Sequence, residues 1–299
     1  MCSVQDRDVA ETQAELTTRG SAVLTGSEQN RASGVDEMQV RNVARERLEK
    51  GEMSLGVGIR TARTVDIAKM MKTSGYDWLF IDLEHGPMSI EFATTLAVAA
   101  LDTGISPIVR VPFMQHTMAT RVLDSGALGV VMPHVDTPEQ AREIVDHLKY
   151  PPIGHRSLAG SQAIFDFKRI PIGEMIEAAN AALLVIPLME TPTAIANAEA
   201  IAAVPGIDAL LIGTNDLAAE MGIPGEFGHA RIAGAYETVI AACRKHNKWP
   251  GMGGVDAEEL MQKYIGMGMR LVLTGSDGGF LMAGASRRAE LAREWGPKR

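Results

Sequence analysis

Residues 107–133 read PIVRVPFMQHTMATRVLDSGALGVVMP and contain two short apolar runs separated by a helix-like segment. The runs occupy 107–111 and 129–133, and the segment 115–125 places its apolar residues at helical spacing. Strands that are apolar on both faces are typical of a parallel sheet covered by helices. This stretch therefore predicts one strand–helix–strand unit of an α/β fold.

The same unit recurs along the chain. We expect strands at 54–59, 78–82, 107–111, 129–133, 183–189, 209–213, 251–254 and 270–274. We expect helices at 38–50, 64–74, 89–103, 115–125, 137–148, 191–203, 230–246, 256–267 and 277–294. Eight such units in about 250 residues predict a (β/α)₈ TIM barrel. A doubly wound open sheet is the alternative, and it is disfavoured because no Gly-x-Gly-x-x-Gly sequence follows the first strand.

Two segments stand outside this alternation. Residues 1–36 are polar and show little periodicity, so we expect a flexible N-terminal extension followed by a catalytic domain over 37–299. Residues 150–182 are longer than a normal connection, and such loops are often functional. We expect 154–172, with Arg156 and Ser157, to form part of a specificity surface that touches an anionic tail; a solvated loop is the alternative.

The composition excludes several classes of protein. A net charge of -8 argues against nucleic-acid binding, which needs a basic face. The two cysteines do not suggest a disulfide framework or a cysteine-rich metal site. Residues 1–36 lack the apolar core of a secretory signal, and no apolar run approaches the ~18 residues of a membrane span. We therefore expect a cytoplasmic protein with no membrane partner.

Two carboxylates follow neighbouring predicted strands, Glu190 after 183–189 and Asp216 after 209–213. Chemistry in this fold takes place at the C-terminal ends of the strands. Two carboxylates there can hold a hard cation such as Mg²⁺ or Mn²⁺, with water and substrate oxygens completing the coordination. The alternative is that this pair forms helix N-caps, because Asp and Thr favour that position and Asp216 could cap a helix that starts at Leu217.

Other polar residues end neighbouring strands. His85 follows Asp82 and Glu84, and a carboxylate that orients an imidazole makes a general base. Arg110 ends an apolar strand, where it needs an anionic partner, either a substrate enolate or carboxylate or an internal acid such as Glu84. The backbone N–H groups of Asn215 and Asp216 open a helix and suit a carboxylate.

Lysine and the remaining histidines give negative evidence. A Schiff-base aldolase needs a lysine inside the barrel, and no lysine lies within a predicted strand. This favours metal chemistry over imine chemistry. His134, His147, His155 and His229 lack ligand-like spacing, and we interpret them as surface or packing residues.

The ordered motifs of residues 38–295 resemble the HpcH/HpaI family of metal-dependent 2-oxo acid aldolases. The matching stretches are DWLFIDLEHG at 77–86, IVRVP at 108–112, GALGVVMP at 126–133, YPPIGHRS at 150–157, MET at 189–191, GTNDL at 213–217 and GSD at 275–277. The resemblance implies the barrel and a homo-oligomer, trimer or hexamer, with an exchanged last helix.

The resemblance also assigns roles. It implies that Glu190 and Asp216 bind a divalent metal, Mg²⁺ or Mn²⁺ and possibly Co²⁺, with no organic cofactor. It places the catalytic base at His85, supported by Asp82, and the enolate-stabilising arginine at Arg110. It implies cleavage or formation of a 4-hydroxy-2-oxo acid, giving pyruvate and an aldehyde, by a metal-enolate mechanism. The amides of Asn215 and Asp216 would bind the pyruvate carboxylate.

Leu188 departs from the family pattern. Pyruvate aldolases of the family usually have Gln two residues before the metal-binding Glu, so a polar contact to the substrate is lost here. The substrate-binding set is thus Arg110, Leu188, Asn215 and Asp216. Two alternatives stay open: a decarboxylase or other lyase acting on an oxaloacetate-like 2-oxo acid, and a catalytically silent barrel that binds an oxo acid.

Overall fold

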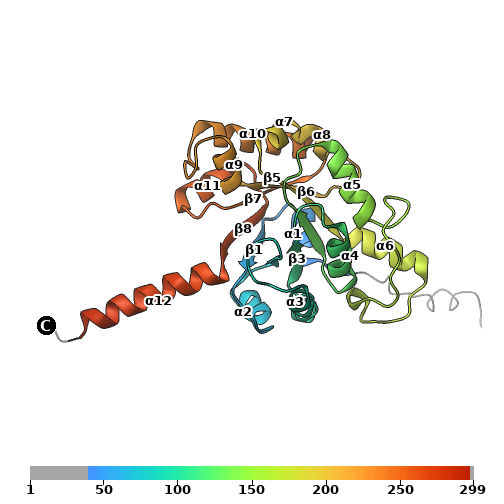
Figure 1. Cartoon of the computed structure of the whole chain (residues 1–299), viewed down its shortest axis with the longest axis horizontal. Coiled ribbons are helices and arrows are strands. Elements are labelled where there is room, and N and C mark those ends of the chain that lie inside the picture. Colours follow the sequence, from blue (N-terminus) through green and yellow to red (C-terminus); the bar gives the residue numbers. More distant parts are fainter. Residues whose placement is uncertain (1–39, 297–299) are drawn as a thin grey trace, which may run out of the picture. The chain divides into compact units, whose positions relative to one another are not determined.

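The computed structural model describes residues 40–296, which form a closed barrel of eight parallel strands. The strands follow chain order, and β8 pairs with β1 to close the barrel (Figure 1). They are β1 Ser54–Ile59, β2 Trp78–Asp82, β3 Ser106–Arg110, β4 Gly129–Met132, β5 Leu184–Met189, β6 Ala209–Gly213, β7 Trp249–Gly253 and β8 Leu271–Ser276. The predicted TIM barrel is confirmed, and the open sheet is excluded.

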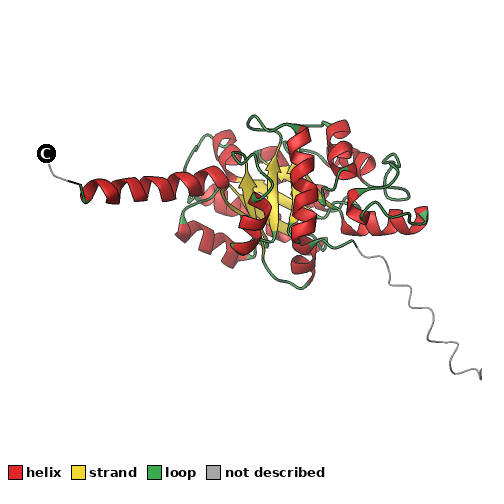
Figure 2. Cartoon of the chain, turned by 90° about the horizontal axis from the view of Figure 1, so that it is seen from below, coloured by secondary structure: helices red, strands yellow, loops and turns green. Residues whose placement is uncertain are grey.

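Helices surround the barrel (Figure 2). They are α1 Val43–Glu49, α2 Ile67–Thr73, α3 Ile90–Thr103, α4 His116–Asp124, α5 Pro138–Leu148, α6 Ile172–Ala182, α7 Pro192–Ala196, α8 Ala198–Ala202, α9 Thr214–Glu220, α10 Ala230–Lys245, α11 Glu258–Met267 and α12 Asp277–Glu294. Outward-facing strand residues pack against them in one large buried cluster. This packing accounts for the apolar runs in the sequence.

The barrel interior is a second, smaller core of inward-facing residues such as Trp78, Ile108 and Leu211. A Cβ atom at Gly56 would lie 2.1 Å from the Trp78 ring, so the indole fits only because residue 56 on the adjacent strand lacks a side chain. Ala44 and Leu48 of α1 join this core, and α1 therefore closes the N-terminal end of the barrel.

Three parts of the chain differ from the prediction. The helix expected over 191–203 is two short helices that meet at Asn197. The excursion 150–182 contains a 3₁₀ turn, Ala163–Phe165, and α6, packed around their own small core. The helix expected to open at Asn215 and Asp216 is α9, which begins at Thr214 directly after β6 and ends at Glu220, a length that the sequence does not predict.

The last helix extends away from the barrel, and none of its residues is buried (Figures 1 and 2). None of the helices in residues 40–296 combines the length and the apolar character needed to cross a bilayer. The expected extension over 1–36 lies outside the described residues.

Candidate active site

The C-terminal end of the barrel holds a cavity of about 280 Å³. It is lined by Arg60, Phe80, His85, Arg110, Leu188, Glu190, Leu211, Ile212, Gly213, Thr214, Asn215, Asp216, Gly253, Gly254 and Leu273. The predicted residues Asn215 and Leu188 are thus brought together with the carboxylates and the arginine. Asp82 lies behind this lining and is completely buried.

Glu190 is a buried carboxylate at the end of β5, only 2% exposed. Its Oε2 accepts a hydrogen bond from the His134 backbone N–H at 3.1 Å and lies 3.3 Å from the His134 ring Nδ1. Burial, followed by the proximity of Asp216, raises the pKa of Glu190 to about 8, against the opposing effects of His134 and Arg110. A divalent cation between Glu190 and Asp216 would offset that repulsion, so this pair fits a metal ion.

Gly213, at the end of β6, leaves the space that Glu190 needs. A Cβ atom at this position would lie 2.7 Å from the Glu190 Cγ atom. The cap interpretation of the two carboxylates does not hold, because Thr191 caps α7 with its own hydroxyl and Gly213 is the N-cap of α9. Neither carboxylate therefore serves as the N-cap of a helix.

Arg110 is held by two acids. Its Nε and Nη2 donate to Asp82 at 2.9 and 2.6 Å, and its Nη1 lies 2.9 Å from Glu84 Oε2. Arg60 donates to the same Asp82 carboxylate at 2.7 Å. These contacts raise the pKa of Arg110 despite its burial and lower that of Asp82. The internal ion pairs expected as one possibility are present, and they fix the guanidinium at the cavity wall.

His85 lines the cavity with its side chain 62% exposed. The acid nearest to its ring is Glu84, whose Oε2 lies 3.9 Å from Nε2. Asp82 contacts His85 through the backbone, accepting its N–H at 3.2 Å. Asp82 therefore holds the loop that carries His85 instead of binding the imidazole.

Thr214 anchors the start of α9. Its buried hydroxyl lies 2.8 Å from both the Tyr236 hydroxyl and the Gly253 carbonyl oxygen. Asn215 and Asp216 consequently lie in the first helical turn, where backbone N–H groups lack intrahelical partners.

The sequence does not predict several residues that contact the site residues or position the loops around the cavity. His134 has a φ of 52° and faces Glu190, and the signal was its place directly after a strand-end proline. Asp277 accepts the backbone N–H groups of Arg60, Thr61 and Ala62, which ties the first strand's loop to α12. The expectation for Arg156 is wrong, because this residue is 5% exposed and its guanidinium pairs with Asp124 at 2.6 Å.

Comparison with known proteins places this site in a family. Residues 60–283 match the HpcH/HpaI aldolase/citrate lyase family. The chain is 37% identical over 248 residues to a 4-hydroxy-4-methyl-2-oxoglutarate aldolase of Hapsidospora irregularis, covering 82% of this chain and 92% of that one. It is 35% identical over 237 residues to the 2-keto-3-deoxy-L-rhamnonate aldolase of Escherichia coli K12, covering 79% and 87%.

Comparison with solved structures supports the same family. An HpcH/HpaI aldolase from Desulfitobacterium hafniense superposes with a TM-score of 0.82 at 26% identity, covering 87% of this chain and all of that one. Fold and relatives define a carbon–carbon lyase of the class II aldolase type, as predicted. The chain belongs to the HpcH/HpaI aldolase/citrate lyase family. A divalent metal is the cofactor of class II aldolases in this family.

Proposed function

We propose that the enzyme cleaves a 4-hydroxy-2-oxo acid to pyruvate and an aldehyde or oxo acid, and catalyses the reverse addition, at the cavity of Glu190 and Asp216. The observation that carries the proposal is the buried Glu190 carboxylate, whose pKa is raised to about 8, with the exposed Asp216 carboxylate and Arg110 beside it. Such a pair suits a dication and a chelating anionic substrate. Glu190 and Asp216 would hold the metal, Mg²⁺ or Mn²⁺ by preference, which supplies Lewis-acid stabilisation of negative charge on the substrate oxygens.

The chain's own residues supply binding and proton transfer. His85 takes the proton of the C4 hydroxyl, directly or through a water molecule. The C3–C4 bond then breaks, its electron pair passes to C3, and the enolate of pyruvate remains until C3 is protonated. Arg110 stabilises the enolate oxygen with the N–H groups that Asp82 and Glu84 leave free.

The remaining lining residues position the substrate. The amides of Asn215 and Asp216 bind the pyruvate carboxylate at the start of α9. Leu188, Phe80 and Leu211 make the inner wall apolar. Leu188 is thus a packing contact where other pyruvate aldolases place a polar one.

Arg60 is the cation at this cavity that suits a carboxylate on the far half of the substrate. It lines the cavity and is about half exposed, 49%, while its Nε is held by Asp82. We therefore expect Arg60→Gln to raise KM for an oxoglutarate-type substrate with a second carboxylate more than for an uncharged sugar-acid type. An equal change in both KM values would contradict this role.

The test of the function is pyruvate release after chelation, with and without added Mg²⁺ or Mn²⁺. The substrates are 4-hydroxy-4-methyl-2-oxoglutarate, 2-keto-3-deoxy-L-rhamnonate and oxaloacetate. Metal-dependent pyruvate from a hydroxy-oxo acid, lost in Glu190→Ala and sharply reduced in His85→Ala, is the expected result. Pyruvate from oxaloacetate alone would indicate a decarboxylase instead of an aldolase. No pyruvate from any of the substrates would indicate a catalytically silent barrel that only binds an oxo acid.

The assembly that we propose is a homo-oligomer, a trimer or hexamer, joined through α12. This helix has no buried residue, yet it carries Phe280, Leu281 and Met282 with 44–65% of their surface exposed. Apolar side chains of this kind indicate a surface that another chain covers.

A further inference from the structure

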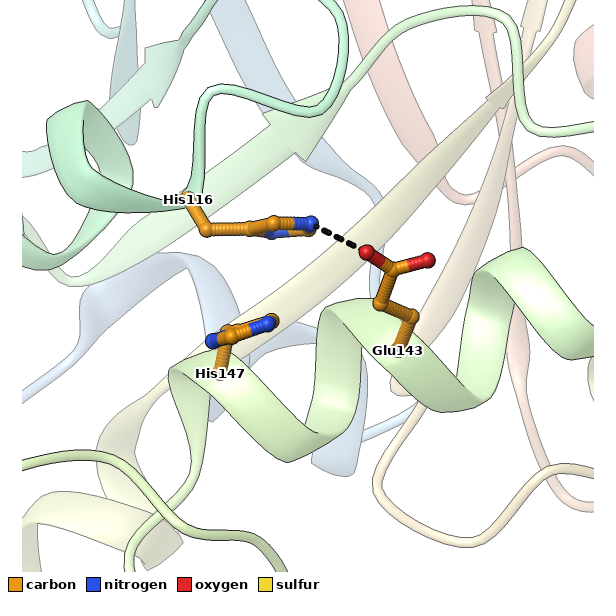
Figure 3. Close-up of side chains that lie close together, drawn as sticks. All are labelled: His116, Glu143 and His147. Atoms are coloured by element: carbon orange, nitrogen blue, oxygen red, sulfur yellow. Dashed lines mark hydrogen bonds and ion pairs between the residues drawn. The ribbon is translucent and has the colours of Figure 1, made fainter.

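Three potential metal ligands meet on the outside of the barrel, away from the residues that line the active-site cavity. His116 is the first residue of α4, and Glu143 and His147 lie one turn apart on α5 (Figure 3). One potential ligand atom from each lies within 4.8 Å of the others, the only such set of three His, Cys, Asp or Glu residues within 40–296. In Figure 3 one ring nitrogen of each histidine lies on the side of the Glu143 carboxylate.

The contacts among these three residues leave ring nitrogens free that could bind a metal. His116 Nε2 lies 3.1 Å from Glu143 Oε1, and the two imidazole rings stack with centroids 4.2 Å apart. Among the described residues, no side-chain hydrogen bond or ion pair of His147 is present. A simple His116–Glu143 pair therefore explains two of the residues but not why a second imidazole lies against the first.

The two rings favour a neutral, metal-binding state. Two protonated imidazoles this close would repel each other, and a neutral ring has a lone pair for a metal. Burial, and next His147, lower the pKa of His116 below its usual value, although Glu143 opposes this. The Glu143 carboxylate supplies the negative charge that a dication needs.

We propose that His116, Glu143 and His147 form a second metal site, which binds Zn²⁺ and bridges α4 to α5. Two imidazoles and one carboxylate are typical zinc ligands, and a water molecule would complete the tetrahedron. Zinc–ligand distances near 2.1 Å place tetrahedral ligand atoms roughly 3.4 Å apart. The three candidate ligand atoms already lie within 4.8 Å of one another, and one pair of them is 3.1 Å apart. The nitrogen-rich set favours Zn²⁺, whereas the all-carboxylate pair Glu190 and Asp216 suits Mg²⁺ or Mn²⁺.

One contact limits the affinity. Nδ1 of His116 is buried without a hydrogen-bond partner. When zinc takes Nε2, the ring proton moves to Nδ1, and no acceptor orients the ring as zinc-bound histidines usually require. The ion is therefore exchangeable and is removed by a chelator, unlike zinc in a fully supported structural site.

Zinc titration of the full-length chain in the Glu190→Gln background tests the site, because that change impairs the active-site pair. We expect one zinc per chain, with affinity lowered about tenfold or more by His147→Ala, His116→Ala or the near-isosteric Glu143→Gln. Bound zinc should raise Tm in the parent but not in the His147→Ala variant. His155→Ala is the matched control, because this exposed histidine already pairs with Asp146.

Two results would overturn the proposal. One is that the Glu190→Gln protein binds no zinc, and the other is that His147→Ala and His155→Ala bind it equally well. Neither result bears on the aldolase, which is tested by pyruvate release. Conversely, zinc binding lost only in the His116, Glu143 and His147 variants would establish the site whatever the reaction proves to be.

Discussion

Arg110 is held in ion pairs inside the barrel, and we propose a catalytic role for the same side chain. Three of its N–H groups are used by Asp82 and Glu84, which fixes the planar guanidinium at the cavity. Arg110→Lys keeps the charge but cannot reach both acids and the substrate with a rigid fork. We expect kcat to fall by about 100-fold, as for loss of an oxyanion contact, with a smaller loss of metal affinity. Steady-state kinetics and metal titration would check this, and unchanged kcat would refute the assigned role.

Glu190 makes metal-free stability depend on pH. Its folded-state pKa is about 8 against an ordinary 4.5, so its stabilising contribution is complete below pH 4.5 and is lost as the pH rises through about 8. Glu190→Gln does not titrate there. In chelator, we expect the Tm of the variant relative to wild type to increase between pH 4.5 and about pH 8.

The matching measurement is thermal unfolding across this pH range with and without Mg²⁺. Added Mg²⁺ should raise the Tm of wild type near pH 8 and leave Glu190→Gln unchanged. A Tm difference that stays constant with pH would contradict the burial argument.

Candidate site residues can be predicted from the sequence where a charged side chain lies at the end of an apolar strand, because burying such a charge is energetically costly. Glu190 and Asp216 stand out because they follow neighbouring strands at the C-terminal end of the barrel, and Arg110 because a guanidinium ending an apolar strand needs an anionic partner. Glu84 is expected as an internal partner of Arg110, and the structure has this pair. The contacts of Asp82 with Arg110 and Arg60 are not expected, because these residues converge only once the barrel closes. His134 was misinterpreted for the same reason, since its contact with Glu190 joins residues 56 positions apart.

Gly213, at the end of β6, leaves the space that the Glu190 side chain occupies in the proposed metal site. Gly213 has φ −88°, which any residue tolerates, so the only obstacle to Ala is the Glu190 side chain 2.7 Å away. Gly213→Ala should displace the carboxylate and weaken metal binding by about tenfold or more, as lost support of a ligand does. Calorimetric metal titration would check this.

Gly234→Ala is the control for that substitution. Nothing lies within 4 Å of a Cβ at this position of α10, so we expect unchanged metal affinity and about 0.5–1 kcal/mol of added stability. Equal metal affinity in both variants would show that Gly213 does not position Glu190.

The positions of the helices and strands follow from periodicity except where a contact between distant segments decides. All eight strands lie within two residues or so of the predicted ranges, because buried parallel strands are apolar throughout. The segment 191–203 has a single helical periodicity, but the helix is interrupted at Asn197. The Asn197 side chain donates a hydrogen bond to the Asp136 carbonyl oxygen. That contact is between distant segments, so no local pattern reports it.

At the scale of the whole molecule, α12 is the feature that one chain does not explain. Asp277 and the Ser276 cap fix its first turn to the barrel, so its direction is set while its apolar residues stay uncovered. We expect wild type to have the mass of a trimer or hexamer in light scattering. Met282→Arg should reduce that mass, because a charge on the covered face costs desolvation in every subunit.

The control for α12 is the same substitution on another helix. Met70 on α2 is 57% exposed, comparable to 65% for Met282, and it is a lone exposed methionine there. Met70→Arg should leave the assembly intact, since scattered apolar side chains need no partner. If both variants keep the wild-type mass, or if wild type is a monomer, α12 does not hold the assembly together. If only Met282→Arg dissociates, its remaining activity per chain then measures whether the active site needs the neighbouring subunit.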